Sequence, residues 1–192
     1  MSGRGNTIAA QTPAKRFNKT RRITITALLS ATCISTNYLM LPLINIKLMD
    51  TIVFIAGFSL GLIPAITVGS ISWLIYGTLN PLGVNLPTLI TVILSETVYA
   101  IPGWIIGRKY HETTPQPSLE LHLTLGATGL LTTLTYDLFT NAIYGWLFQG
   151  SIWIGLLTMN FPIPMGITHE VSNFILFATV APFLIRAIKK II

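Results

Sequence analysis

The stretch DTIVFIAGFSLGLIPAITVGSISWLIYGTLNPLG, residues 50–83, holds a single charged side chain, that of Asp50. A helix that crosses a bilayer needs about 20 predominantly apolar residues, and this stretch is long enough for more than one short helix. Proline removes a backbone N–H and interrupts a helix, so Pro64 makes the stretch either one kinked helix or two helices. We predict two, from Asp50 to Pro64 and from Ala65 to Asn80, because the charges elsewhere favour an even number of spans.

Apolar runs recur along the whole chain, which is 52% hydrophobic and only 9% charged. A soluble domain usually carries roughly 25% charged residues, so this chain has too little charge to cover a surface in water. We predict four further membrane segments: Ile23 to Leu41, Leu86 to Gly107, Leu119 to Phe148 and Thr168 to Ile188. The predicted fold is an all-α membrane protein, a six-transmembrane-helix bundle with a short second and third helix pair.

The twelve basic residues lie mostly near the two ends of the chain, six of them before residue 23 and three after residue 185. Basic residues are enriched on the cytoplasmic side of a membrane. Six spans place all of them except Lys47 on that side, whereas five spans put either Arg108 and Lys109 or the C-terminus outside. We therefore predict both termini to be cytoplasmic, with residues 1–22 a disordered basic tail and residues 23–192 one transmembrane domain.

The formal charge of +6 does not indicate a nucleic-acid binder, because the basic ends carry no interleaved aromatic residues and no domain of their own. Three connections lie outside in the predicted topology: residues 42–49, 81–85 and 149–167. The last is apolar and contains Trp153, Phe161 and Pro162, a composition that a linker in water would not have. It is either an interfacial loop anchored by its tryptophan or a functional lid, and the sequence leaves both open.

No catalytic or metal-binding motif is found in the sequence. The single cysteine, Cys33, excludes an internal disulfide and a multi-cysteine metal site. His169-Glu170 looks like the start of a zinc-protease helix, but that motif needs a second histidine four residues on, where Asn173 stands. A Gly-x-Ser-x-Gly elbow and a Gly-rich phosphate loop are absent as well. We therefore predict no enzyme activity, no metal and no cofactor, and a chain that does not hydrolyse ATP itself.

Polar and aromatic side chains gather in the predicted outer halves of the segments, while the inner halves of the fifth and sixth are nearly free of them. An ionisable group inside a span is costly and faces a cavity or a partner. A one-sided arrangement suits a cup that opens outward better than a channel or proton wire through the membrane. The candidate substrate-binding residues are Asn37, Trp73, Tyr76, Glu96, Tyr136, Asp137, Asn141, Tyr144, His169, Glu170 and Asn173.

Most of these residues also have a purely structural interpretation. His169 and Glu170 fit equally well as caps of a helix that starts beside Thr168. The aromatic residues, taken singly, fit an interfacial belt. Glu96, near the middle of its segment, fits a structural hydrogen-bond hub. Asp137 is the hardest to explain structurally, because a carboxylate several residues inside a span needs a partner or water.

Small residues let membrane helices approach closely. Ala27-xxx-Ala31 lies in the first turns of the first segment, next to the basic tail. We predict that Ala27 and Ala31 form a flat patch at the cytoplasmic edge that receives a partner helix. The pair Gly57-xxx-Gly61 is interpreted as internal packing instead.

Together these features resemble the S components, the substrate-binding membrane subunits, of energy-coupling factor (ECF) transporters. The resemblance covers nearly all of the chain after the tail. Four motifs carry it: Ala27-xxx-Ala31, the short helix pair within residues 50–83, Tyr136-Asp-Leu-Phe-Thr-Asn141 and His169-Glu-Val-Ser-Asn173. It implies a six-helix subunit of a prokaryotic cell membrane that captures a vitamin, cofactor precursor or other micronutrient from outside. It also implies a site in the outer halves of the fourth to sixth spans, under the first external loop.

The resemblance further implies partners. These are a transmembrane coupling subunit, contacted by Ala27 and Ala31, and two ATPase subunits of the same ABC importer, besides membrane lipid. The ligand is not implied, since family substrates vary, but the acidic residues Glu96, Asp137 and Glu170 suit a cationic or amine-bearing molecule. The alternatives are a non-transporting integral membrane scaffold or assembly subunit, and a self-sufficient small transporter or intramembrane enzyme.

Overall fold

The computed structural model of the chain describes residues 19–79, 81, 83, 85–110, 113–160 and 165–191. The predicted disordered tail therefore lies outside the described residues, apart from its last four. These four, Lys19 to Arg22, form the first turn of a helix, so the predicted boundary at residue 23 is wrong by one turn. Phe161, Pro162 and Pro164 of the last predicted connection also lie outside the described residues.

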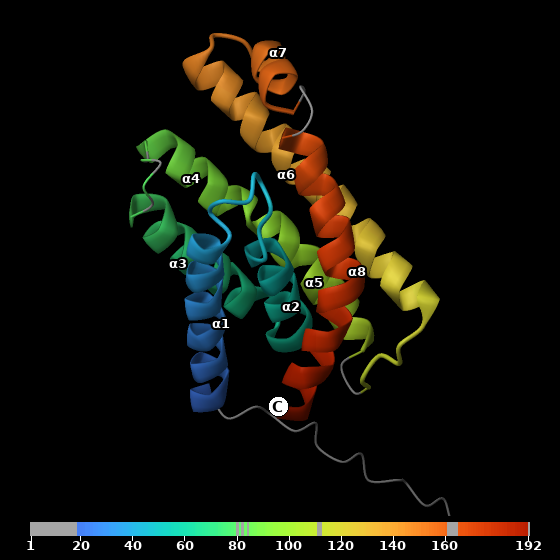
Figure 1. Cartoon of the computed structure of the whole chain (residues 1–192). Coiled ribbons are helices and arrows are strands. Elements are labelled where there is room, and N and C mark those ends of the chain that lie inside the picture. Colours follow the sequence, from blue (N-terminus) through green and yellow to red (C-terminus); the bar gives the residue numbers. More distant parts are fainter. Residues whose placement is uncertain are drawn as a thin grey trace, which may run out of the picture.

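All regular secondary structure in the described residues is helical, and the helices pack side by side in a bundle (Figure 1). The helices α1 and α8 begin and end the described part of the chain at the same end of this bundle, and α7 lies at the other end (Figure 1). The elements are α1 (Lys19–Leu39), α2 (Met49–Leu60), α3 (Leu62–Leu79), α4 (Leu86–Ser95), α5 (Thr97–Lys109), α6 (Leu119–Phe148), α7 (Ile152–Gly155), the π-helical turn η1 (Leu156–Asn160) and α8 (Met165–Ile191).

Among the described residues, three helices are long and apolar enough to cross a membrane: Leu62–Leu79, Leu86–Lys109 when α4 and α5 are taken together, and Gly166–Ile191. Their outward faces carry large apolar side chains such as Leu74, Leu94 and Phe183. Contiguous apolar surface of this kind marks contact with lipid or with another protein. The chain is thus a membrane-embedded helical protein, as the composition predicts.

The break between α2 and α3 lies at Gly61 and not at Pro64, so the predicted boundary of this helix pair is wrong by three residues. Gly61 has φ +99° and ψ 177°, a backbone conformation that side-chain-bearing residues rarely adopt. Pro64 stands in the first turn of α3, where its missing N–H would have no partner in the helix anyway. The prediction of two helices in place of one kinked helix is confirmed.

The fourth predicted segment is likewise divided, since α4 ends at Ser95 and α5 begins at Thr97. The residue between them is Glu96. The start of α4 is well defined, because the side-chain oxygen of Asn85 accepts a hydrogen bond of 2.8 Å from the backbone N–H of Thr88. The predicted segment from Leu86 to Gly107 agrees with the 24-residue candidate span Leu86–Lys109, in which Glu96 is a single turn residue with φ −59° and ψ −22°.

The helix α2 lies at the centre of the bundle, and Ser59 is its one residue that is not buried. It packs directly on α5 through glycines. A Cβ added at Gly103 would lie 2.2 Å from the carbonyl oxygen of Phe54, and one at Gly107 would lie 2.3 Å from that of Phe58. Glycine at these two positions therefore lets the two backbones touch, which is how helices attract each other in lipid.

Candidate functional site

Three helices contribute ionisable side chains to one buried network in the half of the bundle nearer α7. Asp50 stands in the first turn of α2, Asp137 in α6, and His169 in the second turn of α8. His169 Nε2 lies 2.8 Å from Asp50 Oδ2, and His169 Nδ1 lies 2.9 Å from Asp137 Oδ1. All three side chains are buried. One imidazole ring therefore joins α2 and α6 to α8.

The position of the ring also indicates its charge. Both of its nitrogens face a carboxylate, and only the doubly protonated imidazolium can donate at both. Such charge-assisted hydrogen bonds are stronger than neutral ones, and more so away from water. Tyr136 packs edge-on against the ring at 6.0 Å between centroids and limits its tilt.

Asn173, one turn after His169, extends the network. Its Nδ2 donates to Asp50 Oδ2 at 2.7 Å and to Thr133 Oγ1 at 2.8 Å. The same Thr133 oxygen receives the hydroxyl of Tyr99 at 3.2 Å, which ties α5 to the cluster. Four helices, α2, α5, α6 and α8, are thus held by consecutive hydrogen bonds between buried side chains.

A second acidic group lies at the break between α4 and α5. Glu96 is 1% exposed, and its Oε2 accepts the indole N–H of Trp73 at 2.8 Å. The site is close-packed, because a Cβ added at Gly69 of α3 would lie 2.6 Å from the Cγ of Glu96. Interrupted membrane helices with a polar group at the break are typical of solute and ion sites in transporters.

The segment between α1 and α2 covers this corner. The ammonium of Lys47 lies 4.7 Å from the centre of the Trp73 ring. Tyr76 packs against the same ring at 5.9 Å and meets Tyr38 edge-on at 5.3 Å. Asn37, near the end of α1, donates to the sulfur of Met49 at 3.1 Å. Aromatic, acidic and amide side chains therefore meet beneath residues 40–48.

We name this set of buried groups the polar cluster: Asn37, Asp50, Trp73, Tyr76, Glu96, Tyr99, Thr133, Tyr136, Asp137, His169 and Asn173. Eight of these are residues that the sequence analysis predicts for the substrate site. The other three predicted residues are not among these buried groups, because Asn141 and Glu170 are half-buried and Tyr144 lines a separate pocket. The alternative that His169 caps its helix is wrong, because α8 begins at Met165 and places His169 in its second turn.

The sequence analysis does not predict three members of the cluster, namely Asp50, Tyr99 and Thr133. A signal for Asp50 exists, since it is the one charge in residues 50–83, but its position at the edge of the run suggests a loop. Tyr99 and Thr133 carry no comparable signal. Threonine is common in α6, and only the packing of α5 and α8 shows which of its hydroxyls lies inside.

Comparison with protein-family models, with curated proteins and with solved structures gives no match for this chain. The site must therefore be interpreted from its own geometry.

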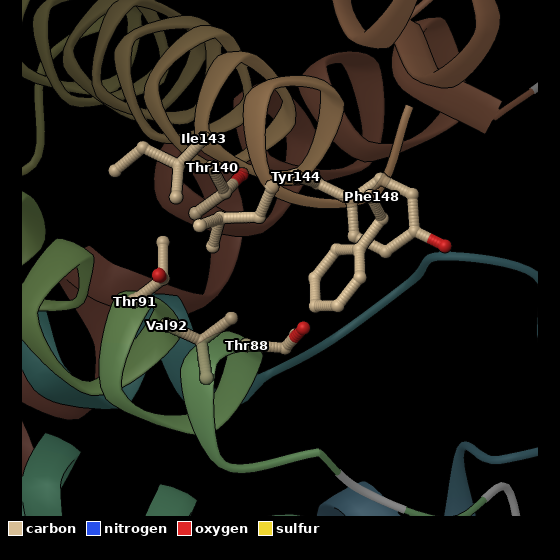
Figure 2. Close-up of a pocket in the computed structure, with 8 residues that line it drawn as sticks. Thr88, Thr91, Val92, Thr140, Ile143, Tyr144 and Phe148 are labelled. Atoms are coloured by element: carbon tan, nitrogen blue, oxygen red, sulfur yellow. The ribbon is translucent and has the colours of Figure 1, made fainter. Parts of the chain in front are cut away.

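A small, partly open pocket lies between α4 and the last turns of α6 (Figure 2). Its walls are apolar and hydroxyl-bearing, and the rings of Tyr144 and Phe148 pack at 4.9 Å between centroids. None of the polar-cluster residues lines it. The lining residues are Thr88, Thr91, Val92, Thr140, Ile143, Tyr144, Leu147 and Phe148.

The polar cluster offers carboxylates, amide groups, hydroxyls and one imidazole as charged and hydrogen-bonding groups. Within the part of the chain that the structure describes, no three His, Cys, Asp or Glu side chains are arranged to hold a metal ion. Far from the cluster, Ala27 and Ala31 lie exposed on α1, while Ser30 and Cys33 face the bundle interior. The predicted docking patch is therefore not covered by any described part of the chain.

Proposed function

We propose that this protein is the substrate-binding membrane subunit of an importer of the ECF type, with the polar cluster as its ligand site. The observation that carries the proposal is the junction of Asp50, His169 and Asp137, three ionisable groups from three helices buried in one place. An ionisable residue within a membrane bundle is by default a functional candidate. Burying it costs free energy, and an apolar side chain would fill the same space without that cost.

The position of the cluster supports capture from one side of the membrane. Asn37 lies near the end of α1, Asp50 in the first turn of α2 and His169 in the second turn of α8, at the helix ends opposite to Lys19 and Ile191 (Figure 1). The opposite half is filled by apolar side chains such as Phe58, Phe177, Ala181 and Ile185. A conducting path would need polar groups along its whole length, whereas a receptor open on one side does not.

The proposed topology has six spans with both termini in the cytoplasm. The helices α1 and α6 have the length to cross a membrane, at 21 and 30 residues. Their many hydroxyls are compatible with lipid, because they donate back to carbonyls of the same helix, as Thr32 does to Leu28 and Thr135 does to Leu131. With both ends inside, the polar cluster faces the exterior.

The ligand-binding part of the proposal is tested with purified protein in detergent. We expect a co-purified molecule by mass spectrometry, or a vitamin whose addition raises the melting temperature through linkage; a ligand at 100 times its Kd adds about 2.7 kcal/mol. Asp137→Asn retains an acceptor for His169 Nδ1 but removes the charge, so it should abolish this shift without unfolding the protein. Glu120→Gln, at an exposed position in the first turn of α6, is the matched control and should bind normally.

If the wild-type protein carries no bound molecule and no vitamin stabilises it, the receptor proposal fails, and a membrane scaffold becomes the better explanation.

The docking part is tested separately. Replacing both Ala27 and Ala31 with Leu adds bulk to the exposed face of α1, so co-purification with a coupling subunit should be lost while the ligand-induced shift stays at its wild-type value. Ala127→Leu makes the same change at an exposed position of α6 and should leave both intact. Equal loss of docking and ligand binding in the Ala27/Ala31 variant would contradict this division of roles.

A further inference from the structure

Within the polar cluster several hydrogen-bond donors have acceptors, whereas three buried acceptor oxygens have no partner. The indole of Trp73, the amide nitrogens of Asn37 and Asn173 and the hydroxyl of Tyr99 all have acceptors. By contrast, Glu96 Oε1, Asn173 Oδ1 and Asn37 Oδ1 are buried without any partner. A buried polar atom left without a partner costs about 1–3 kcal/mol, so these three oxygens are suited to a donor that the chain itself does not supply.

The orientation of Asn173 follows from its neighbours. The hydroxyl of Thr133 donates to the carbonyl of Gly129 at 2.7 Å, so its oxygen accepts from Asn173. The carboxylate of Asp50 can only accept as well. Both contacts therefore require the amide nitrogen of Asn173 to point toward Asp50 and Thr133, so Oδ1 points away from these two residues. Because Nδ2 and Oδ1 are bonded to the same carbon, Oδ1 still lies next to the polar cluster.

The balance of charges in the polar cluster also favours a ligand that brings hydrogen-bond donors. Three carboxylates, those of Asp50, Glu96 and Asp137, lie among one imidazolium, that of His169, and one ammonium, that of Lys47. When all five groups are ionised, one negative charge remains. An uncompensated charge is costly in a medium of low dielectric constant, and either a proton on Glu96 or a bound monocation would neutralise it.

The place for that cation is the corner formed by Trp73 and Glu96. The face of this indole already attracts the ammonium of Lys47 at 4.7 Å, while the edge of the same indole donates to Glu96. An aromatic face beside a carboxylate is a common receptor for ammonium groups. Lys47 stands on the connection between α1 and α2, so it can leave the ring without unwinding a helix.

We propose that the ligand of this site carries a positively charged nitrogen, which displaces the ammonium of Lys47 from Trp73 and pairs with Glu96. This inference rests on the proposed receptor function and narrows its substrate class to organic cations. The spare oxygens of Asn37 and Asn173 then accept N–H or O–H groups from the rest of the ligand.

The first experiment compares matched probes on the wild-type protein in detergent. Pyridoxamine and thiamine are cationic, pyridoxine is the neutral analogue of pyridoxamine, and riboflavin and biotin are neutral and anionic vitamins. We expect only cationic compounds to raise the melting temperature, and ammonium chloride to raise it no more than sodium chloride does. A shift with ammonium alone would mean an inorganic cation site and would overturn the inference.

The second experiment uses two substitutions with opposite expected signs. Glu96→Gln retains an oxygen for Trp73 but loses the charge, so the Kd of the cationic probe should rise about tenfold. Lys47→Met removes the competing ammonium, so the same Kd should fall about tenfold. Glu120→Gln and Lys190→Met, which change an exposed carboxylate and an exposed lysine elsewhere, should have no effect.

The outcomes separate this inference from the proposed function. If riboflavin or biotin binds and no cation does, the receptor function stands and the cationic substrate class is wrong. If the Lys47→Met variant binds the cation more weakly, the proposed displacement is wrong. If no probe binds and no molecule co-purifies, both proposals fail together. If Glu96→Gln does not fold, the wild-type comparison and Lys47→Met still decide the question.

Discussion

The two halves of this bundle are held together in different ways. In the half that holds the polar cluster, α2, α6 and α8 are joined by side chains that reach across to one another, as His169 does to Asp50 and Asp137, while α6 and α7 touch through Gly145 and Gly155. In the other half the backbones themselves touch, because Gly103 and Gly107 leave no side chain between α5 and α2. Aromatic rings fill the remaining space, with Phe54 and Phe177 at 4.9 Å between centroids.

Close contact between two backbones leaves no space between the helices and resists opening, whereas side-chain hydrogen bonds can exchange partners at little net cost. We therefore expect the half with the α2–α5 glycine contacts to be the more rigid one and the half with the polar cluster to be the more adaptable one. The predictions below test this contrast from the largest effect to the smallest.

The largest loss of stability is expected for His169→Ala. The substitution leaves Asp50 and Asp137 as two buried carboxylates without their shared partner, which typically costs about 3–5 kcal/mol. It should appear as a large drop in melting temperature in detergent. His122→Ala, which removes a single 2.7 Å contact from a ring nitrogen to the carbonyl of Ala178, serves as the matched control with a smaller drop. Equal effects for the two variants would refute a special role for the junction.

The next effect concerns the glycine contacts. Gly103→Ala places a methyl group 2.2 Å from a backbone oxygen of Phe54, which α2 cannot move aside, and we expect a loss of about 1–3 kcal/mol. Gly77→Ala meets only the Cδ1 of Leu89, the mobile end of a side chain, at 2.6 Å. It should therefore cost clearly less in the same unfolding assay. A reversed order would mean that the two backbones are not in contact at α5.

The smallest effect is expected for a polar contact in the rigid half. Arg22 donates through Nη2 to the carbonyl of Leu60 at 2.6 Å, at the last turn of α2. Arg22→Met should cost only about 1–2 kcal/mol, because it removes one hydrogen bond at an exposed edge. Thermal unfolding measures it, with Arg21→Met as the control. A loss as large as that of His169→Ala would erase the contrast between the halves.

Much of this architecture follows from local sequence. Apolar runs place the helices to within a few residues, since a long run in lipid has few alternatives to a helix. The acidic side chain in the middle of a predicted span, Asp137, indicates a buried partner. The tight turn between α2 and α3 is less predictable, because Gly61 and Pro64 both interrupt helices and only the structure shows which one does.

The pairings are the part that sequence does not specify. His169 faces Asp137 because α6 and α8 pack together, and it faces Asp50 because α2 is inserted beside them. The hydropathy pattern indicates where along its helix a residue lies. It does not indicate which neighbouring helix the side chain faces. The contact of Glu96 with Trp73 is hidden for the same reason, since the two residues lie on different helices.

The burial of α2 has a consequence for how the protein is made. This helix has 12 residues and extends about 18 Å, too short to cross about 30 Å of hydrocarbon. It is covered on nearly every side by neighbours that include α5 and α8, and Asp50 finds its histidine 119 residues further along the chain. The final environment of α2 is therefore complete only when α8, which begins more than 100 residues later, has been made and packed beside it.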